Sequence, residues 1–256
     1  MMANILVNKS VSLLEITLNR PDNGNALSLE LIEELNQTLE KYHNDREIKL
    51  VTITGQGDKF FIAGGDIKEL AEVRSESDIE TMIELGRKTL DTIRYYPVPV
   101  IALINGYALG GGAELAMACD YRLAIEKASV GFVHSTLNIT TAWGGIIDLI
   151  YLLGHTKALF TLIEGKTIKA KEAQTLGLID SVSDDIDSAY SSIESIKKTF
   201  EKCNTDVIRS NKTIINESKR LFHKNLKTLE SVEFKKTWGS KEHWNALEAL
   251  LSELPS

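Results

Sequence analysis

Apolar residues along the first half of the chain repeat with two different periods, one typical of strands and one typical of helices. Residues 11–19 (VSLLEITLN) alternate and are rich in β-branched side chains, which predicts a strand. Residues 29–42 follow Ser28, a residue preferred at helix N-caps, and repeat their apolar side chains at helical spacing. Three short apolar runs predict further, buried strands: residues 50–54, 98–105 and 121–125.

Helices are predicted between these strands. A helix over 78–93 ends before Pro97, and a helix of small residues covers 113–118. Strand, crossover helix and strand in succession indicate an α/β fold. After Gly144 the pattern is mostly helical, with a short helix at 169–175 and a brief strand at 178–182.

A change in organisation is expected near residue 190. We expect a core over residues 1–190 and a helical region over 191–256, because the periodicity after Asp187 is helical almost to the end. No linker rich in glycine, serine or proline separates the two. The C-terminal helices are therefore expected to pack on the core or on a neighbouring subunit.

The composition of the 256 residues is that of a folded globular protein, with 43% hydrophobic and 25% charged residues. The formal net charge of −7 argues against a broad nucleic-acid surface. The charge is unevenly spread, since residues 202–236 contain nine basic and four acidic residues. This stretch is either a local phosphate-binding surface or a solvated helical face.

Cysteine usage and the N-terminus point to the cytoplasm. Cys119 and Cys203 are far apart and lack metal-ligand spacing, which is typical of a reducing compartment. The N-terminus lacks the layout of a signal peptide, and we expect no apolar stretch to reach the roughly 18 residues that span a bilayer. We therefore expect a cytoplasmic protein that binds neither membranes nor nucleic acid.

The segment Asn105–Asp120 (NGYALGGGAELAMACD) is the most informative for chemistry. A buried strand ends at Asn105, and Gly110–Gly112 precede a predicted helix that carries Glu114 in its first turn. Free N–H groups at such a helix start favour negative charge, which suits a developing oxyanion. The alternative is that the glycines only allow close packing of strand and helix.

The segment Phe60–Leu70 (FFIAGGDIKEL) has the same character. It runs from a strand through Ala-Gly-Gly into a polar turn and a short helix, so the N–H of Gly65 is a possible second oxyanion donor. Together, the two segments closely resemble the crotonase (enoyl-CoA hydratase/isomerase) superfamily. Further segments share the resemblance, which covers nearly the whole chain: residues 18–35, 97–112 and 158–182.

The resemblance implies a fold and a set of functional residues. The fold is a spiral of ββα turns with C-terminal helices at the interface of a homotrimer or a dimer of trimers. The substrate is an acyl-CoA thioester, coenzyme A being part of the substrate, with no other cofactor and no metal. The N–H groups of Gly65 and Gly111 form the oxyanion hole. The CoA-binding positions are Asn25, Ala26, Leu27, Ala63, Asp66 and Ile67, and the basic stretch adds Lys235 and Lys236.

One catalytic position departs from the hydratase pattern. Hydratases of the superfamily carry two glutamates; Glu114 matches the first, but His134 stands at the second. A histidine still exchanges protons near neutrality, although it is also compatible with a purely structural role. Thr141 stands where a proline is common, so the loop around it is expected to differ.

Three functions remain open at this point. Phe132-Val133-His134 with Trp143-Gly144-Gly145, and the C-terminal residues 237–251, look like the ethylmalonyl-CoA/methylmalonyl-CoA decarboxylase branch. Loss of CO₂ from a malonyl-type thioester gives the enolate that an oxyanion hole stabilises, and decarboxylation is the leading hypothesis. The alternatives are an enoyl-CoA hydratase or isomerase, favoured by Glu114, and a non-catalytic CoA- or RNA-binding relative.

The remaining candidates receive structural interpretations. Cys119 is expected to pack inside its helix, because no base is visible nearby for a nucleophile. Trp238 and Trp244 are interpreted as helix-packing residues. Four further histidines show no metal-ligand spacing: His43, His155, His223 and His243.

Overall fold

Six strands form the larger of two sheets in the computed structural model, which describes residues 3–253. The strand order is β1-β2-β3-β5-β7-β10, and every neighbouring pair is parallel except β1 with β2. The register places Ile53 of β3 opposite Ala102 of β5, and Leu103 of β5 opposite Leu123 of β7. The strands are β1 (Ile5–Lys9), β2 (Leu13–Leu18), β3 (Leu50–Gly55), β5 (Val100–Ile104), β7 (Tyr121–Ile125) and β10 (Ser181–Ser183).

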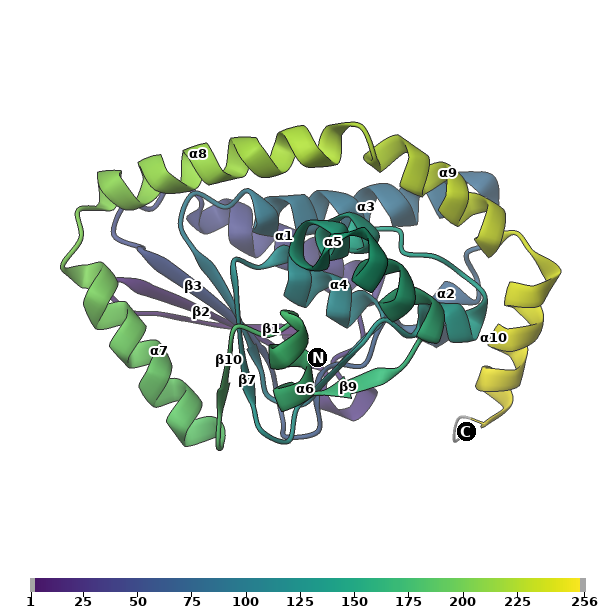
Figure 1. Cartoon of the computed structure of the whole chain (residues 1–256), viewed down its shortest axis with the longest axis horizontal. Coiled ribbons are helices and arrows are strands. Elements are labelled where there is room, and N and C mark those ends of the chain that lie inside the picture. Colours follow the sequence, from purple (N-terminus) through teal and green to yellow (C-terminus); the bar gives the residue numbers. More distant parts are fainter. Residues whose placement is uncertain (1–2, 254–256) are drawn as a thin grey trace.

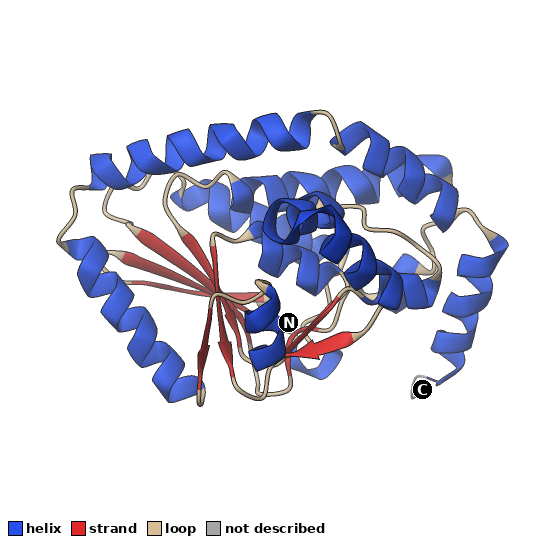
Figure 2. Ribbon diagram, viewed as in Figure 1, coloured by secondary structure: helices blue, strands red, loops and turns tan. Residues whose placement is uncertain are grey.

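A second sheet has four short strands in the order β4-β6-β8-β9. Three strands of the first sheet, β3, β5 and β7, each continue into a short strand of the second sheet (β4, β6 and β8) and then into helical structure, so the chain winds as repeated ββα turns (Figures 1 and 2). The α/β fold class is thereby confirmed. The short strands are β4 (Phe60–Ile62), β6 (Tyr107–Leu109), β8 (Ser129–Gly131) and β9 (Thr167–Lys169).

Helices between the strands supply the other half of the core. Helix α1 (Leu29–Tyr42) begins where predicted, and the Ser28 side chain accepts a hydrogen bond from the N–H of Leu31. Its apolar stripe is buried, Leu31 and Leu35 being fully shielded. The other helical segments of the core region are η1 (Pro21–Asn23), α2 (Ile67–Leu70), α3 (Glu76–Arg94), α4 (Gly111–Ala118), η2 (Val133–Leu137), α5 (Gly145–Glu164) and α6 (Ala170–Leu176).

The predicted strand over 178–182 is wrong in its start. Gly177 adopts a left-handed conformation that caps α6, and the N–H of Leu178 donates back to the carbonyl of Ala173. Leu178 and Ile179 are buried as part of this cap, so their apolar character reflects packing and not a sheet. The strand β10 begins only at Ser181.

The C-terminal helices wrap around the core. Figure 1 shows α8 and α9 along one edge of the molecule and α10 turning away from that edge, near the short helix α2. The predicted boundary between residues 190 and 191 falls inside a helix, α7. The helices are α7 (Ile186–Glu201), α8 (Thr205–Lys224), α9 (Lys227–Trp238) and α10 (Lys241–Glu253).

Helix α5 contradicts the expectation that no apolar stretch is long enough for a bilayer. Its 20 residues pass a test of length and composition for a membrane span, a test that core helices of soluble proteins also pass. The helical dihedrals are interrupted at Gly154, and Asp148 in its first turn is paired with the buried Arg94. Several apolar side chains of α5 lie on the surface: Tyr151, Leu159, Phe160 and Ile163.

Candidate active site

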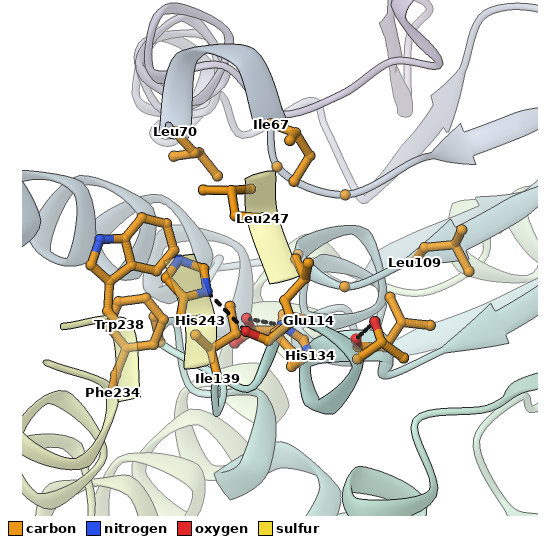
Figure 3. A pocket seen from close by; sticks show the side chains of 18 of the residues that line it. Ile67, Leu70, Leu109, Glu114, His134, Ile139, Phe234, Trp238, His243 and Leu247 are labelled. Carbon is orange, nitrogen blue, oxygen red and sulfur yellow. Dashed lines mark hydrogen bonds and ion pairs between the residues drawn. The ribbon is translucent and has the colours of Figure 1, made fainter. Parts of the chain in front are cut away.

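The two glycine-rich segments meet at one edge of the smaller sheet. Strands β4 and β6 are parallel neighbours, with Phe60 opposite Tyr107, so the segments that follow them leave from the same edge. Gly65, after β4, and Gly111, after β6, line one cavity of about 330 Å³. Glu114 and His134 line the same cavity (Figure 3). The four residues predicted to be catalytic are therefore brought together.

The N–H groups of both glycines are available to a ligand. The residues on either side of Gly65 make hydrogen bonds with Leu27, but the N–H of Gly65 does not. The N–H of Leu27 donates to the carbonyl of Gly64, and the N–H of Asp66 donates to the carbonyl of Leu27. Gly111 is the first residue of α4, where an N–H has no partner in the preceding turn. Within residues 3–253 neither N–H has a hydrogen-bond partner.

Gly110 shapes the start of α4. Its φ of 50° and ψ of −120° are accessible to glycine and strained for other residues. Its own N–H donates to the carbonyl of Gly131 and its carbonyl accepts from Ala113 and Glu114. The turn at Gly110 thus joins β6 to the helix while the next N–H, that of Gly111, stays free beside the cavity.

Glu114 is buried and fully engaged. Its Oε2 accepts hydrogen bonds from the N–H groups of Trp143 (3.0 Å) and Gly145 (2.9 Å). Its Oε1 lies 3.2 Å from Nε2 of His134. Because three donors converge on one carboxylate, its position in the first turn of α4 is fixed before any ligand binds.

His134 comes from the next turn of the spiral, on η2, directly after β8. It is 8% exposed, and its Nδ1 has no hydrogen-bond partner within the described chain. An ionised carboxylate only accepts hydrogen bonds, so with Glu114 ionised Nε2 carries the proton and Nδ1 keeps a lone pair. This is the arrangement in which a carboxylate orients an imidazole as a base.

The loop that holds Glu114 is itself held from outside by a second carboxylate. The hydroxyl of Thr141 donates to Oε1 of Glu230 on α9 (2.6 Å) and accepts from the N–H of Ile146 (3.0 Å). Arg87 of α3 donates to Oε2 of Glu230 (2.7 Å) and to the carbonyl of Ala142 (2.6 Å). Thr141 therefore replaces the common proline with a hydrogen-bonded link to a C-terminal helix.

The environment of Glu230 disfavours its charge. Burial, together with the nearby charge of Glu114, raises the pKa of Glu230 to about 7, although Arg87 acts in the opposite direction. Sequence reasoning missed Glu230 and Arg87, because a charged residue in a helix normally indicates the solvent face.

Trp143 forms the wall of the cavity between α3 and α4. A Cβ on Gly86 would lie 2.2 Å from its Nε1, so α3 is in direct contact with the indole at a position where only glycine leaves room. A Cβ on Gly111 would lie 2.6 Å from Cζ3, which places the other end of the indole against the oxyanion donor. Arg94 fixes the backbone by donating to the Trp143 carbonyl (2.6 Å).

The C-terminal helices close the cavity, which the sequence did not indicate. Trp238 packs as predicted, donating from Nε1 to the carbonyl of Val73 (3.0 Å), but it also lines the cavity. His243, to which the sequence analysis gave no functional role, is fully buried and lines the same wall. Four further residues of α9 and α10 belong to this side: Phe234, Leu247, Leu250 and, packed behind them, Trp244.

The predicted CoA-binding residues occupy two kinds of position. Ala63 and Ile67 line the cavity, and Leu27 is hydrogen-bonded to its rim. Asn25 is fully buried at a φ of 53°, and its amide donates to the carbonyls of Gln56 and Phe60 (3.0 Å each), which fixes the turn before α1. These contacts give Asn25 a structural role, and Ala26, also buried, adjoins it.

The charged members of the predicted CoA site are paired within the chain. Asp66 caps α2 and forms an ion pair with Arg20 (2.8 Å). Lys235 is paired with Glu80 and Lys236 with Glu233. None of these three side chains lines the cavity in the described chain, so a phosphate contact would require the lysines to exchange partners.

Within residues 3–253, neither Cys119 nor the remaining His, Asp and Glu side chains form a second site. Cys119 is buried at the end of α4, and burial raises the pKa of its thiol to about 12, which suppresses the thiolate. Among the residues that the structure describes, no group of three His, Cys, Asp or Glu side chains is placed to hold a metal ion.

The spiral fold, with two free N–H groups beside Glu114, is that of the crotonase superfamily. A family model described as enoyl-CoA hydratase/isomerase matches residues 8–252, and the chain belongs to this family. An enoyl-CoA hydratase structure from Bacillus halodurans superposes with a TM-score of 0.90 over 96% of this chain and 100% of that one, at 24% identity, and shows the fold.

Nearer relatives carry hydratase names. The short-chain-enoyl-CoA hydratase of Clostridium acetobutylicum is 37% identical over 179 residues, 70% of this chain and 68% of that protein. The structure of an enoyl-CoA hydratase from Bacillus anthracis is 32% identical, with a TM-score of 0.81 over 98% of this chain and 97% of that one. The alignments with the curated relatives span 56 to 69% of those proteins' own lengths. These names fit the alternative of hydration better than decarboxylation.

Proposed function

We propose that this protein is an enoyl-CoA hydratase that adds water across the double bond of a 2-enoyl-CoA thioester. The observation that carries the proposal is the convergence of two free N–H groups, of Gly65 and Gly111, on the cavity that holds the Glu114–His134 pair. The hydratase names of the relatives support it. The acyl-CoA thioester is the substrate, and no separate cofactor is proposed.

The site performs the reaction with its own groups. Water attacks Cβ as Nδ1 of His134 removes its proton, and the electrons of the double bond move through Cα onto the thioester oxygen. The N–H groups of Gly65 and Gly111 stabilise the resulting enolate oxygen. The imidazolium, held by Glu114, then returns the proton to Cα, so that one water is consumed and no proton is gained or lost.

The direct test is turnover of crotonyl-CoA followed by the loss of its conjugated double bond. Rapid hydration supports the proposal. Replacement of His134 by alanine should lower kcat by roughly 10²-fold or more with a small effect on KM, because the imidazole acts in the transition state. Wild-type protein that binds crotonyl-CoA without hydrating it would contradict the proposal.

A second candidate, decarboxylation of a methylmalonyl- or ethylmalonyl-type CoA thioester, is favoured by one observation. The walls are mostly apolar, and no lysine or arginine lines the cavity within residues 3–253. A carboxylate in such surroundings is poorly solvated, which favours its departure as neutral CO₂. The carbon–carbon bond electrons would pass to the thioester oxygen, and protonated His134 would then deliver a proton to Cα.

One substitution separates the two reactions. His134→Glu creates the paired carboxylates of the hydratase pattern, so hydration of crotonyl-CoA should be retained or increased. It removes the imidazole acid, so any CO₂ release from methylmalonyl-CoA or ethylmalonyl-CoA should fall. Both activities are measured on each variant with the same preparation. If the wild type releases CO₂ and hydrates nothing, the second candidate replaces the first.

We further propose that the protein works in the cytoplasm as a homotrimer or a dimer of trimers. Large apolar side chains are exposed on the C-terminal helices, including Ile214 at 72% and Leu221 at 62%. Surfaces of this kind are typical of subunit interfaces. Light scattering during gel filtration should give a mass of three or six subunits, and Ile214→Asp should shift it towards one.

A further inference from the structure

The side chain of His243 lines the cavity and carries a hydrogen-bond acceptor that has no partner in the described chain. The residue is fully buried, and its Nδ1 lies 2.9 Å from the carbonyl oxygen of Leu137 (Figure 3). A carbonyl only accepts, so Nδ1 carries the hydrogen, and in the neutral ring Nε2 carries a lone pair. Burial lowers the pKa of His243 against the opposing effect of the bond to Leu137, which keeps the ring neutral.

Nothing in the described chain satisfies this acceptor. Nε2 of His243 has no hydrogen-bond partner within residues 3–253. Two indoles restrain the ring, because Trp238 packs against it with 4.4 Å between ring centroids and Trp244 packs against it at 5.0 Å, both in tilted arrangements. A buried acceptor without a partner costs folding free energy, so its persistence calls for an explanation.

The position of His243 connects this acceptor to the catalytic segment. Leu137, which receives the Nδ1 hydrogen bond, ends η2, the segment that carries His134. Asn138 adds a second bond between η2 and α10, from its amide to the carbonyl of Glu242 (3.2 Å). The acceptor is thus held at a defined place relative to the reacting groups.

Resting on the proposal that the cavity binds an acyl-CoA thioester, we propose that Nε2 of His243 accepts a hydrogen bond from an O–H or N–H group of that thioester. Two parts of such a molecule offer this chemistry, a hydroxyl on the acyl chain and an amide N–H of the pantetheine arm. His243 is then a substrate-binding residue that selects for a donor, in a wall whose other members are apolar: Phe234, Trp238, Leu247 and Leu250.

Two substitutions test the two roles of His243 independently, Nε2 as a hydrogen-bond acceptor and Nδ1 as the donor to Leu137. In His243→Asn the amide nitrogen can replace Nδ1 as donor to Leu137, and no acceptor remains at Nε2. In His243→Gln the amide oxygen reaches the place of Nε2, and the bond to Leu137 is lost. Thermal unfolding of both variants reports the structural cost independently of binding.

The ligands are two saturated thioesters that cannot be hydrated, butyryl-CoA and 4-hydroxybutyryl-CoA, titrated calorimetrically into the wild type and both variants. If the donor is an acyl hydroxyl, the wild type binds 4-hydroxybutyryl-CoA about tenfold more tightly than butyryl-CoA. This preference disappears in His243→Asn and survives in His243→Gln. If the donor is a pantetheine amide, His243→Asn binds both ligands more weakly than the wild type, by about the same factor. His243→Gln then binds both ligands with an affinity close to that of the wild type.

Unchanged binding of both ligands in a folded His243→Asn variant overturns the inference and leaves the acyl-CoA function intact. The same holds if both variants lose affinity in proportion to lost stability, since His243 would then only brace η2. Failure of the wild type to bind either thioester would instead contradict the proposed function itself.

Discussion

Oε1 of Glu114 and Nε2 of His134 lie 3.2 Å apart, although their residues belong to different turns of the spiral. Glu114 lies in the first turn of α4 and His134 lies on η2, and the parallel pairing of β6 with β8 brings the two turns side by side. The imidazole of His134 therefore stands in place of the second carboxylate expected for a hydratase, and it is paired directly with the first, that of Glu114.

Glu114→Gln should lower kcat on the accepted substrate by roughly 10²- to 10⁴-fold with little change in KM. The amide no longer compensates an imidazolium, and its NH₂ group is mismatched with at least one of the three donors around the carboxylate. Steady-state kinetics give the measurement, with the exposed Glu84→Gln on α3 as the matched control. Equal losses in both variants would disprove the role of Glu114.

Thr141→Val should destabilise the protein by about 1–3 kcal/mol, because the N–H of Ile146 loses its acceptor and Glu230 loses a donor in a buried setting. The loop that orients Glu114 should loosen at the same time, so kcat should fall as well. Urea unfolding and kinetics are compared with Thr213→Val, an exposed threonine of α8. A variant of unchanged stability would show that the link to α9 is dispensable.

The titration of Glu230 gives a pH dependence with a definite sign. The folded protein raises its pKa from 4.5 to about 7, so the folded state binds more protons than the unfolded state in this interval. Stability from this group is present below pH 4.5 and is lost as the pH rises towards 7. Glu230→Gln should therefore flatten the stability profile over this range.

The measurement is the free energy of unfolding of both proteins at a series of pH values between 4.5 and 8. Glu233→Gln, an exposed substitution on the same helix, should leave the wild-type profile unchanged. A Glu230→Gln profile parallel to that of the wild type would refute the assignment.

Trp143→Leu should extend the acyl chains that the enzyme accepts. The indole fills the space between Gly86 of α3 and Gly111 of α4, and its removal opens room next to the oxyanion hole. The ratio of kcat/KM for octenoyl-CoA over crotonyl-CoA should rise, at a stability cost of about 2–5 kcal/mol. Phe160→Leu, a substitution of an exposed aromatic residue on α5, is the control, and an unchanged ratio in Trp143→Leu would count against Trp143 as the wall.

Local patterns predicted the parts of the fold that local chemistry determines. Helix α1 was predicted at its observed bounds, because Ser28 caps it and its apolar stripe is unambiguous. The short strands β4, β6, β8 and β9 were not predicted as a second sheet, because three-residue segments carry too little periodicity. The start of β10 was predicted too early, because Leu178 and Ile179, buried at the cap of α6, form an apolar run like that of a strand.

The candidate site divides in the same way. Gly65, Gly111, Glu114 and His134 were identified from motifs, and the structure brings them to one cavity. Glu230 and His243 were not identified, because their roles depend on which part of the core α9 and α10 pack against. Helical periodicity shows which face is buried, but it does not show what that face is buried against.

The catalytic groups and the residues that close the substrate cavity come from different parts of the chain. The oxyanion donors and the Glu114–His134 pair are complete by residue 134, whereas Phe234, Trp238, His243 and Leu247 close the cavity from the last two helices. During synthesis the catalytic groups therefore leave the ribosome long before the pocket that confines their substrate exists. The same two helices later brace the catalytic segments, α9 through Glu230 and Thr141 and α10 through His243 and Leu137, so the centre built first is fixed in place only when the end of the chain has folded.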